Sequence, residues 1–175
     1  ISRSGANNCT VYHKGLNGGT DPEDYGVYLD DTAVQVDSVN FWNDTAPTSS
    51  VFTVGTASKT NASSATYVAY LFATADGVSK VGSYTGDGTS PKTIDCGFSS
   101  GARFVLLRKV SGGDSWYLFD TMQGIADGSA DGFFMLDNQS AQTRNQNLIE
   151  PHSSGFKAKL WANGSGDQWI FYAIA

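Results

Sequence analysis

ATYVAYLFA, residues 65–73, returns in altered form as DQWIFYAIA, residues 167–175, and this recurrence decides the fold of the chain. Both stretches combine aromatic and small or aliphatic residues in a similar order, and both close on alanine. Self-similarity of this kind indicates one structural unit used twice. Three further pairs of segments match in the same order: Val11–His13 with Leu118–Asp120, Tyr28–Asp31 with Met135–Asn138, and Ser49–Phe52 with Ser153–Phe156.

The composition predicts an all-β fold. Glutamate occurs only twice, and Gly, Ser, Thr, Asn and Asp are abundant between short apolar runs. The runs Thr66–Phe72 and Phe104–Leu107 have the length of strands and are bounded by turn residues. Helix is expected only in short pieces. Four Asp-Gly steps favour tight turns, because glycine adopts positive φ freely: Asp76-Gly77, Asp87-Gly88, Asp127-Gly128 and Asp131-Gly132.

The repeat predicts two tandem, similar antiparallel β-sandwich modules of a jelly-roll or lectin-like type. The first would span residues 1–75 and the second residues 76–175, with the join near Thr74–Gly77. Because that join is short and contains no Pro-rich or Ser-rich linker, the modules are expected to pack together. One fused sandwich is the alternative.

The first module is expected to lack its opening strand. In the second module the apolar run Ala102–Leu107 precedes the loop Ser111–Asp114, whereas the first module starts at its equivalent loop, Ser4–Asn7. A sandwich without this strand has an unpaired edge and an open apolar face. Either residues from outside 1–175 or a strand donated by another subunit would complete it.

Charge and hydropathy argue against two classes of partner. The formal net charge is −6, and the basic residues are scattered, which is not typical of a nucleic-acid-binding surface. No stretch approaches the roughly 20 apolar residues that span a bilayer. We therefore expect neither a nucleic-acid partner nor a membrane partner.

The two cysteines, Cys9 and Cys96, fit two interpretations. They are either two buried free thiols, since free cysteine packs as a small hydrophobe, or a disulfide that links the modules. Cys9 matches Trp116 of the second copy, at an inward position of a strand.

Five Asn-x-Ser/Thr sequons also have two interpretations. Asn and Ser are common turn residues, and the same tripeptides are glycosylation acceptors in surface proteins. The asparagines are Asn8, Asn43, Asn61, Asn138 and Asn163.

No catalytic constellation stands out, and the chain is predicted not to be an enzyme. His13 and His152 are the only histidines, and both are expected in surface loops. No cofactor is expected, and the single metal candidate is a weak calcium loop with Asp127, Ser129 and Asp131 at alternate positions. A solvated loop is the alternative interpretation, because Asn138 stands where a calcium loop has its bidentate acid.

A series of motifs runs along the chain: Thr45–Gly55, Asn61–Ser63 leading into Tyr67–Ala73, Ser79–Gly88, Gly97–Phe98 and Phe104–Lys109. This series resembles an uncharacterised β-sandwich repeat of marine-phage tail-fibre-like and other virion structural proteins. The similarity covers nearly the whole chain and departs from the family at Cys9, where tryptophan is usual, and at Cys96, where an aromatic residue is common. The resemblance implies no catalytic residues.

The resemblance implies a virion structural protein that self-assembles into, or decorates, an external appendage and takes part in host attachment. Its partners would be further copies of itself and other virion proteins, on the virion surface or in the extracellular space. Two alternatives are a carbohydrate-binding module and a subunit of an extracellular filament joined by strand donation. Trp42, Trp116 and Trp161 are the candidate glycan contacts, because aromatic faces stack on sugars, although each lies in or beside a strand and also fits a core position.

Overall fold

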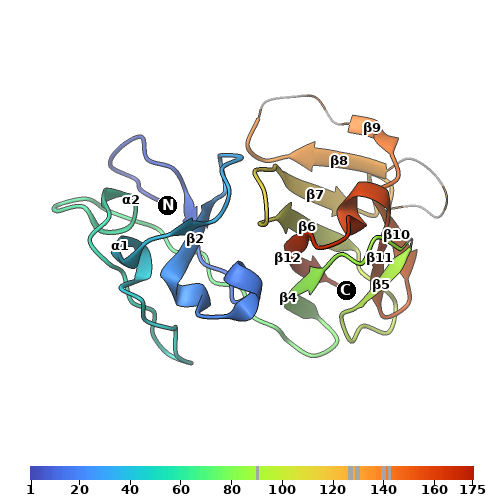
Figure 1. Ribbon diagram of the computed structural model, residues 1–175, viewed down its shortest axis with the longest axis horizontal. Helices are drawn as coiled ribbons and strands as arrows, with labels where there is room; N and C mark the ends of the chain where they lie inside the picture. Colours follow the sequence, from blue (N-terminus) through green and yellow to red (C-terminus); the bar gives the residue numbers. More distant parts are fainter. Residues whose placement is uncertain (90, 126–127, 129–130, 139–140, 142) are drawn as a thin grey trace.

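The computed structural model of the chain describes residues 1–89, 91–125, 128, 131–138, 141 and 143–175 (Figure 1). It is mostly β-structure, as predicted, in three antiparallel sheets. The largest sheet runs β4 (Ser79–Thr85), β12 (Gln168–Ile174), β6 (Phe104–Lys109), β7 (Trp116–Asp120), β8 (Asp131–Met135) and β9 (Thr143–Gln146). The second runs β10 (Ile149–His152), β11 (Gly155–Ala158) and β5 (Lys92–Asp95), and the third runs β1 (Thr10–Val11), β2 (Tyr25–Tyr28) and β3 (Val36–Asp37).

The helices are short, as the composition predicts. The α-helical pieces are α1 (Val39–Trp42) and α2 (Ser58–Asn61), and the 3-10 turns are η1 (Leu16–Gly19), η2 (Pro22–Asp24) and η3 (Leu160–Asn163). Among the residues described, none of these helices has the length and apolar character needed to cross a bilayer.

The main core lies between the six-stranded sheet and the sheet β10-β11-β5. Trp169, Phe171 and Ala173 of β12 are all buried in it, because alternate side chains of a strand point to the same face. Phe156 of β11 meets Phe171 edge-on, with 5.4 Å between the ring centroids. The C-terminal region, residues 76–175, is therefore a β-sandwich.

The opposite face of the six-stranded sheet is covered by the N-terminal region, residues 1–75. Ile170 of β12 and Trp116 of β7 point to this face and form a second buried cluster with Leu16 and Val27. Figure 1 shows the two regions as neighbouring bodies, blue to cyan and green to red. The central sheet consequently has an apolar layer on both of its faces.

A buried arginine crosses the boundary between the two regions. Arg108 of β6 is fully buried, and its Nη1 donates hydrogen bonds to the carbonyl oxygens of Tyr28 (3.2 Å) and Asp31 (2.8 Å). Its Nη2 donates to the carbonyl of Ala33, and the indole Nε1 of Trp116 donates to Tyr28 at 2.8 Å. Burial lowers the pKa of Arg108, while the carboxylates of Asp137, Asp114 and Asp31 raise it again. The end of β2 and the turn that follows it are thus hydrogen-bonded to the central sheet through three carbonyls.

The predicted repeat is present in one hairpin of each region. β1 pairs with β2 through Thr10–Tyr28 and Val11–Val27, and β7 pairs with β8 through the matching Tyr117–Met135 and Leu118–Phe134. Both hairpins close in the same way: Asp30 accepts from the Cys9 amide at 2.8 Å, and Asp137 accepts from the Trp116 amide at 3.1 Å. Cys9 and Trp116 therefore occupy equivalent positions, as the sequence match predicts.

The remainder of the N-terminal region differs from the sandwich expected for residues 1–75. Phe52 is 43% exposed whereas its match Phe156 is buried, and Leu71 is 77% exposed whereas its match Ala173 is buried. Within the residues described, this region has one three-stranded sheet and no sheet facing it. The physical reason is that residues 1–75 contain no counterpart of β6. In the C-terminal sandwich β6 pairs with both β12 and β7, and its inward side chains fill the core.

His13 is buried, which corrects the expectation of a surface histidine. Its Nδ1 accepts from the Gly15 amide at 2.9 Å, so the proton of the neutral ring is on Nε2, which donates to the carbonyl of Phe171 at 3.2 Å. Burial lowers the pKa of His13 to about 4, and the ammonium of Lys14 adds to this effect. The side chain hydrogen-bonds the N-terminal region to the central strand β12.

Replacement of Arg108 by Met should destabilise the fold by about 2 to 4 kcal/mol, because the carbonyls of Asp31 and Ala33 would lose their side-chain donor and that of Tyr28 would keep only Trp116. Chemical denaturation would measure the loss. The matched control is Arg103→Met, which removes an exposed arginine next to the same strand and should change stability by less than about 0.5 kcal/mol. Equal effects of the two changes would contradict a role for Arg108 in joining the regions.

Stability should fall as the pH drops from 6.5 to about 4, the folded-state pKa of His13. The unfolded chain binds a proton at His13 in this window and the folded chain does not, so protonation favours unfolding, by up to about 3 kcal/mol once the pH is below both values. The pH dependence of the free energy of unfolding measures this, with His13→Gln as the comparison, since glutamine keeps a donor for Phe171 but does not titrate. The His13→Gln variant should lose the part of this pH dependence that arises from His13. An unchanged pH dependence of the free energy of unfolding would contradict the lowered pKa of His13.

Candidate functional site

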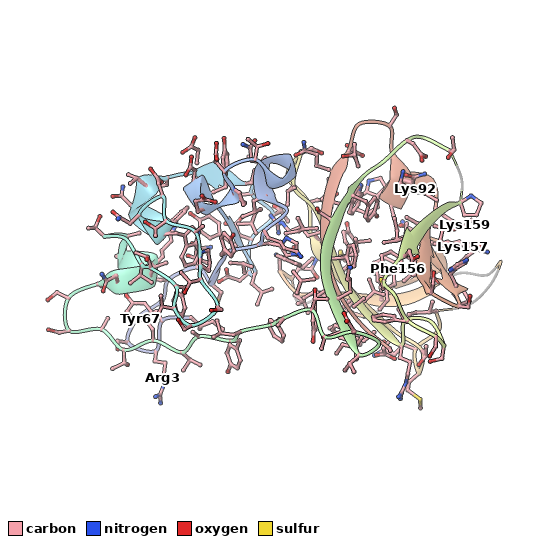
Figure 2. All side chains as sticks on the ribbon, turned by 90° about the horizontal axis from the view of Figure 1, so that it is seen from below. Arg3, Tyr67, Lys92, Phe156, Lys157 and Lys159 are labelled. Carbon is pink, nitrogen blue, oxygen red and sulfur yellow. The ribbon has the colours of Figure 1, made fainter. Side chains whose placement is uncertain are left out.

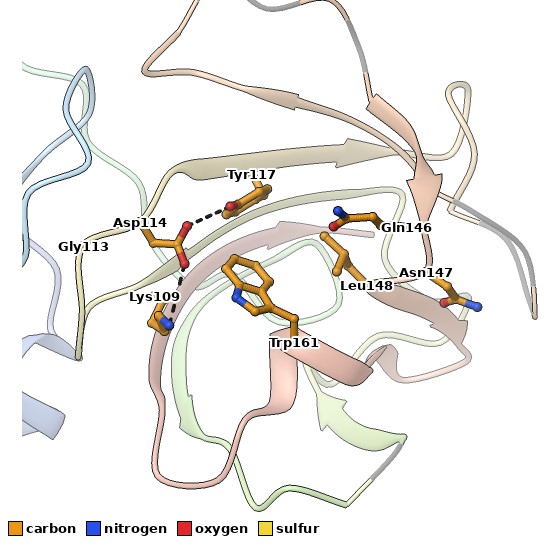
Figure 3. Close-up of a pocket in the computed structure, with 8 residues that line it drawn as sticks. All are labelled: Lys109, Gly113, Asp114, Tyr117, Gln146, Asn147, Leu148 and Trp161. Carbon is orange, nitrogen blue, oxygen red and sulfur yellow. Dashed lines mark hydrogen bonds and ion pairs between the residues drawn. The ribbon is translucent and has the colours of Figure 1, made fainter.

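An open cleft of about 740 Å³ lies on the C-terminal region (Figure 3). Its wall combines the end of β6, the loop that leads into β7, β7 itself, the segment between β9 and β10, and η3. The residues that line it are Lys109, Gly113, Asp114, Tyr117, Gln146, Asn147, Leu148 and Trp161.

Two aromatic residues form the apolar part of the cleft. Trp161 of η3 is half-buried and packs edge-on against Tyr117 and against the core residue Trp169, with 4.9 Å between the ring centroids in each case. These two contacts hold the indole in place, because edge-to-face pairs are a favoured aromatic geometry.

Charged groups stand beside the aromatic pair. The Tyr117 hydroxyl donates to Asp114 Oδ1 at 2.8 Å, and Lys109 Nζ lies 3.9 Å from Asp114 Oδ2 and 3.7 Å from Asp167 Oδ2 (Figure 3 draws the first two). The same ammonium is 5.6 Å from the centroid of Trp161. Burial and the neighbouring Asp114 raise the pKa of Tyr117, which keeps its hydroxyl protonated.

The arrangement is suited to a polar ligand with an apolar face. The half-buried ring of Trp161 offers a surface for C–H groups, while the carboxylate of Asp114, the ammonium of Lys109 and the amide of Gln146 offer hydrogen-bond partners. Sugars present both kinds of group.

The structure separates the three tryptophans that the sequence singles out. Trp161 lines the cleft. Trp116 is buried between the two regions, so it is a core residue and not a glycan contact. Trp42 is half-buried in α1, where its Nε1 donates to the carbonyl of Tyr25 at 2.9 Å.

The calcium hypothesis falls largely outside the described part of the chain, since Asp127 and Ser129 lie there. Asp131 is buried, and its Oδ2 accepts hydrogen bonds from the amides of Leu148 (2.7 Å) and Ile149 (2.9 Å). These bonds tie the start of β8 to the start of β10, which is a structural role for this carboxylate. The described residues contain no group of three or more His, Cys, Asp or Glu side chains placed to hold a metal ion.

Cys9 and Cys96 are free thiols in the structure. Cys9 is half-buried at the start of the β1–β2 hairpin, whereas Cys96 is buried in the core of the sandwich. Burial raises the pKa of Cys96 to about 11. The sulfur of Cys96 therefore stays protonated at neutral pH and packs as an apolar group.

Asn163 is buried, which removes it from the candidate glycosylation sites. Its Oδ1 accepts from the Asp87 amide at 3.1 Å and its Nδ2 donates to Asp87 Oδ1 at 2.9 Å. The side chain therefore fixes the loop after β4. Asn43, Asn61 and Asn138 are exposed and Asn8 is half-buried.

Lys109, Asp114 and Tyr117 do not stand out in the sequence as ligand contacts. A weak signal exists, because Asp114 and Tyr117 follow a glycine-containing loop after an apolar strand. Trp161 is more than 40 positions further along the chain, and only the packing of η3 against β7 brings it to the same cleft.

Comparison with known proteins gives a family assignment. No curated protein and no solved structure matches the chain. A family model described as a domain of unknown function, DUF7483, matches residues 1–175. The chain, a β-sandwich with a second layer on its central sheet, therefore belongs to the DUF7483 family of domains of unknown function.

Proposed function

We propose that this domain is a non-enzymatic surface module of a phage virion appendage and that it binds a host glycan in the cleft beside Trp161. The cleft carries the proposal, because it places the half-buried ring of Trp161, a carboxylate and an ammonium within reach of one ligand. The resemblance to tail-fibre-like proteins supplies the setting. A stable β-scaffold with such a site on its surface suits attachment to a cell envelope.

The polar groups of the cleft favour binding over hydrolysis. Glycoside hydrolases use two carboxyl groups, one as a proton donor and the other as a nucleophile or base. Here one ammonium, Lys109, lies within 4 Å of both nearby carboxylates, and Asp114 already accepts a hydrogen bond from Tyr117. Carboxylates whose charge is balanced by Lys109, one of them oriented by a hydrogen bond, are suited to accept hydrogen bonds from sugar hydroxyls.

Trp161→Ala should weaken glycan binding roughly tenfold, which corresponds to about 1.4 kcal/mol, because the ligand loses the aromatic surface of the cleft. An array of bacterial surface polysaccharides would identify a ligand, and titration calorimetry would then compare the variants. The matched control is Phe134→Ala, which removes a partly exposed aromatic side chain of β8 that does not line the cleft. Control and wild type should bind equally.

Two results would contradict this function. Unchanged binding by the Trp161 variant would remove the cleft as the site. Release of reducing ends from the bound polysaccharide, abolished by Asp114→Asn, would show that the cleft belongs to a hydrolase.

A further inference from the structure

The N-terminal region covers only part of the sheet face that it meets. Paired residues of neighbouring antiparallel strands point to the same face, so the strand register defines rows of side chains across the six-stranded sheet. One row holds Ile170, Arg108 and Trp116, which are buried against the N-terminal region. The next row, called the apolar row below, runs across five strands and consists of Val81, Tyr172, Leu106, Leu118 and Phe134.

The apolar row continues the boundary between the two regions into open surface. Leu106 still packs against the cluster that the N-terminal region buries. Phe134 is 38% exposed, and the other members of the row are half-buried. None of the five side chains is charged, which is typical of the centre of an interface.

The segment that joins the two regions adds protruding side chains to this face. Phe72 packs on Tyr172 of the apolar row, with 4.8 Å between the ring centroids, and is 63% exposed even so. Its neighbours Tyr70 and Leu71 are 67% and 77% exposed. Figure 2 shows the chain leaving Tyr67 along the lower rim, from the N-terminal region to the sandwich.

The open apolar surface is large enough for a stable dimer. At roughly 200 Å² for a large side chain, the exposed parts of Tyr70, Leu71, Phe72, Met122 and Phe134 amount to about 700 Å². Each partner of a standard protein interface buries about 800 Å². Exposed apolar patches of this size mark interaction sites.

A hollow at the end of the same face complements the protruding Phe72. It has a volume of about 370 Å³ and is lined in part by Phe104, Ile174 and Met122. Phe104 and Ile174 are a strand pair, two residues along from Leu106 and Tyr172, so the hollow adjoins the apolar row. One chain therefore presents both a protruding aromatic ring and an apolar hollow on one face, and a second copy of the chain fits such a surface.

We propose that two copies of this domain pack face to face as a two-fold dimer, with Phe72 of each copy in the hollow of the other. The apolar row of each copy then lies against Phe104 and Ile174 of its partner. Each N-terminal region stands on the face that meets the partner, so the two N-terminal regions lie at opposite ends of the dimer. The inference concerns assembly and does not depend on glycan binding.

Sedimentation equilibrium of residues 1–175 between about 1 and 100 µM tests the proposal, since interfaces of this size have micromolar or tighter dissociation constants. The wild type should have twice the monomer mass of 18.6 kDa. Phe72→Lys should raise the dissociation constant roughly 100-fold, because a two-fold interface carries the change twice, and Phe72→Ala roughly tenfold. The matched control is Phe52→Lys, which changes an exposed phenylalanine of the N-terminal region outside these rows and should leave the dimer intact. Near-ultraviolet circular dichroism confirms that each variant is folded.

A dimer weakened by both Phe72 variants and not by the control would support the proposal. A wild type that is monomeric at 100 µM would overturn it. So would a dimer that Phe72→Lys and Phe52→Lys leave equally strong, because it would use another face. Association that grows into filaments with concentration would also overturn it, because a two-fold interface closes at two copies.

Discussion

The apolar side chains on both faces of the six-stranded sheet are the constraint on which the rest of this structure depends. β12 turns Trp169, Phe171 and Ala173 to one face and Ile170 to the other, and each of these residues is buried. Antiparallel sheets commonly leave one face in water, but this sheet requires cover on both sides. The sheet β10-β11-β5 provides one cover, and the N-terminal region provides the other.

Hydrogen bonds through Arg108 and Trp116 make the second cover specific. A purely apolar contact would tolerate sliding, whereas a guanidinium that donates to the carbonyls of Tyr28, Asp31 and Ala33 fixes the position of the turn after β2. Burial of a charged group costs free energy. The hydrogen bonds of the guanidinium offset this cost only while all three acceptor carbonyls stay in place. These hydrogen bonds therefore specify which residues of the two regions meet.

The same boundary supports the candidate glycan cleft. Gly113, which lines the cleft, lies so close to the N-terminal region that an added Cβ would be 2.8 Å from the carbonyl oxygen of Thr32. The loop that carries Asp114 is thus held by residues from the other half of the chain. This coupling means that the N-terminal region shapes the cleft without contributing a side chain to it.

The sequence by itself determined the β-rich fold, the short helices and the repeated hairpin, because strand-length apolar runs and turn residues are local properties. The match of Cys9 with Trp116 is such a case, as both amides bind an aspartate at the same position of equivalent hairpins. It did not determine which side chains are accessible: Trp116, His13 and Asn163 are buried, and Trp161 reaches the cleft. Only the tertiary structure decided this, because the accessibility of a side chain depends on which distant segments cover the face on which it lies. The two similar halves also differ in architecture, because residues 76–175 contain β6 between β12 and β7 and residues 1–75 contain no such strand.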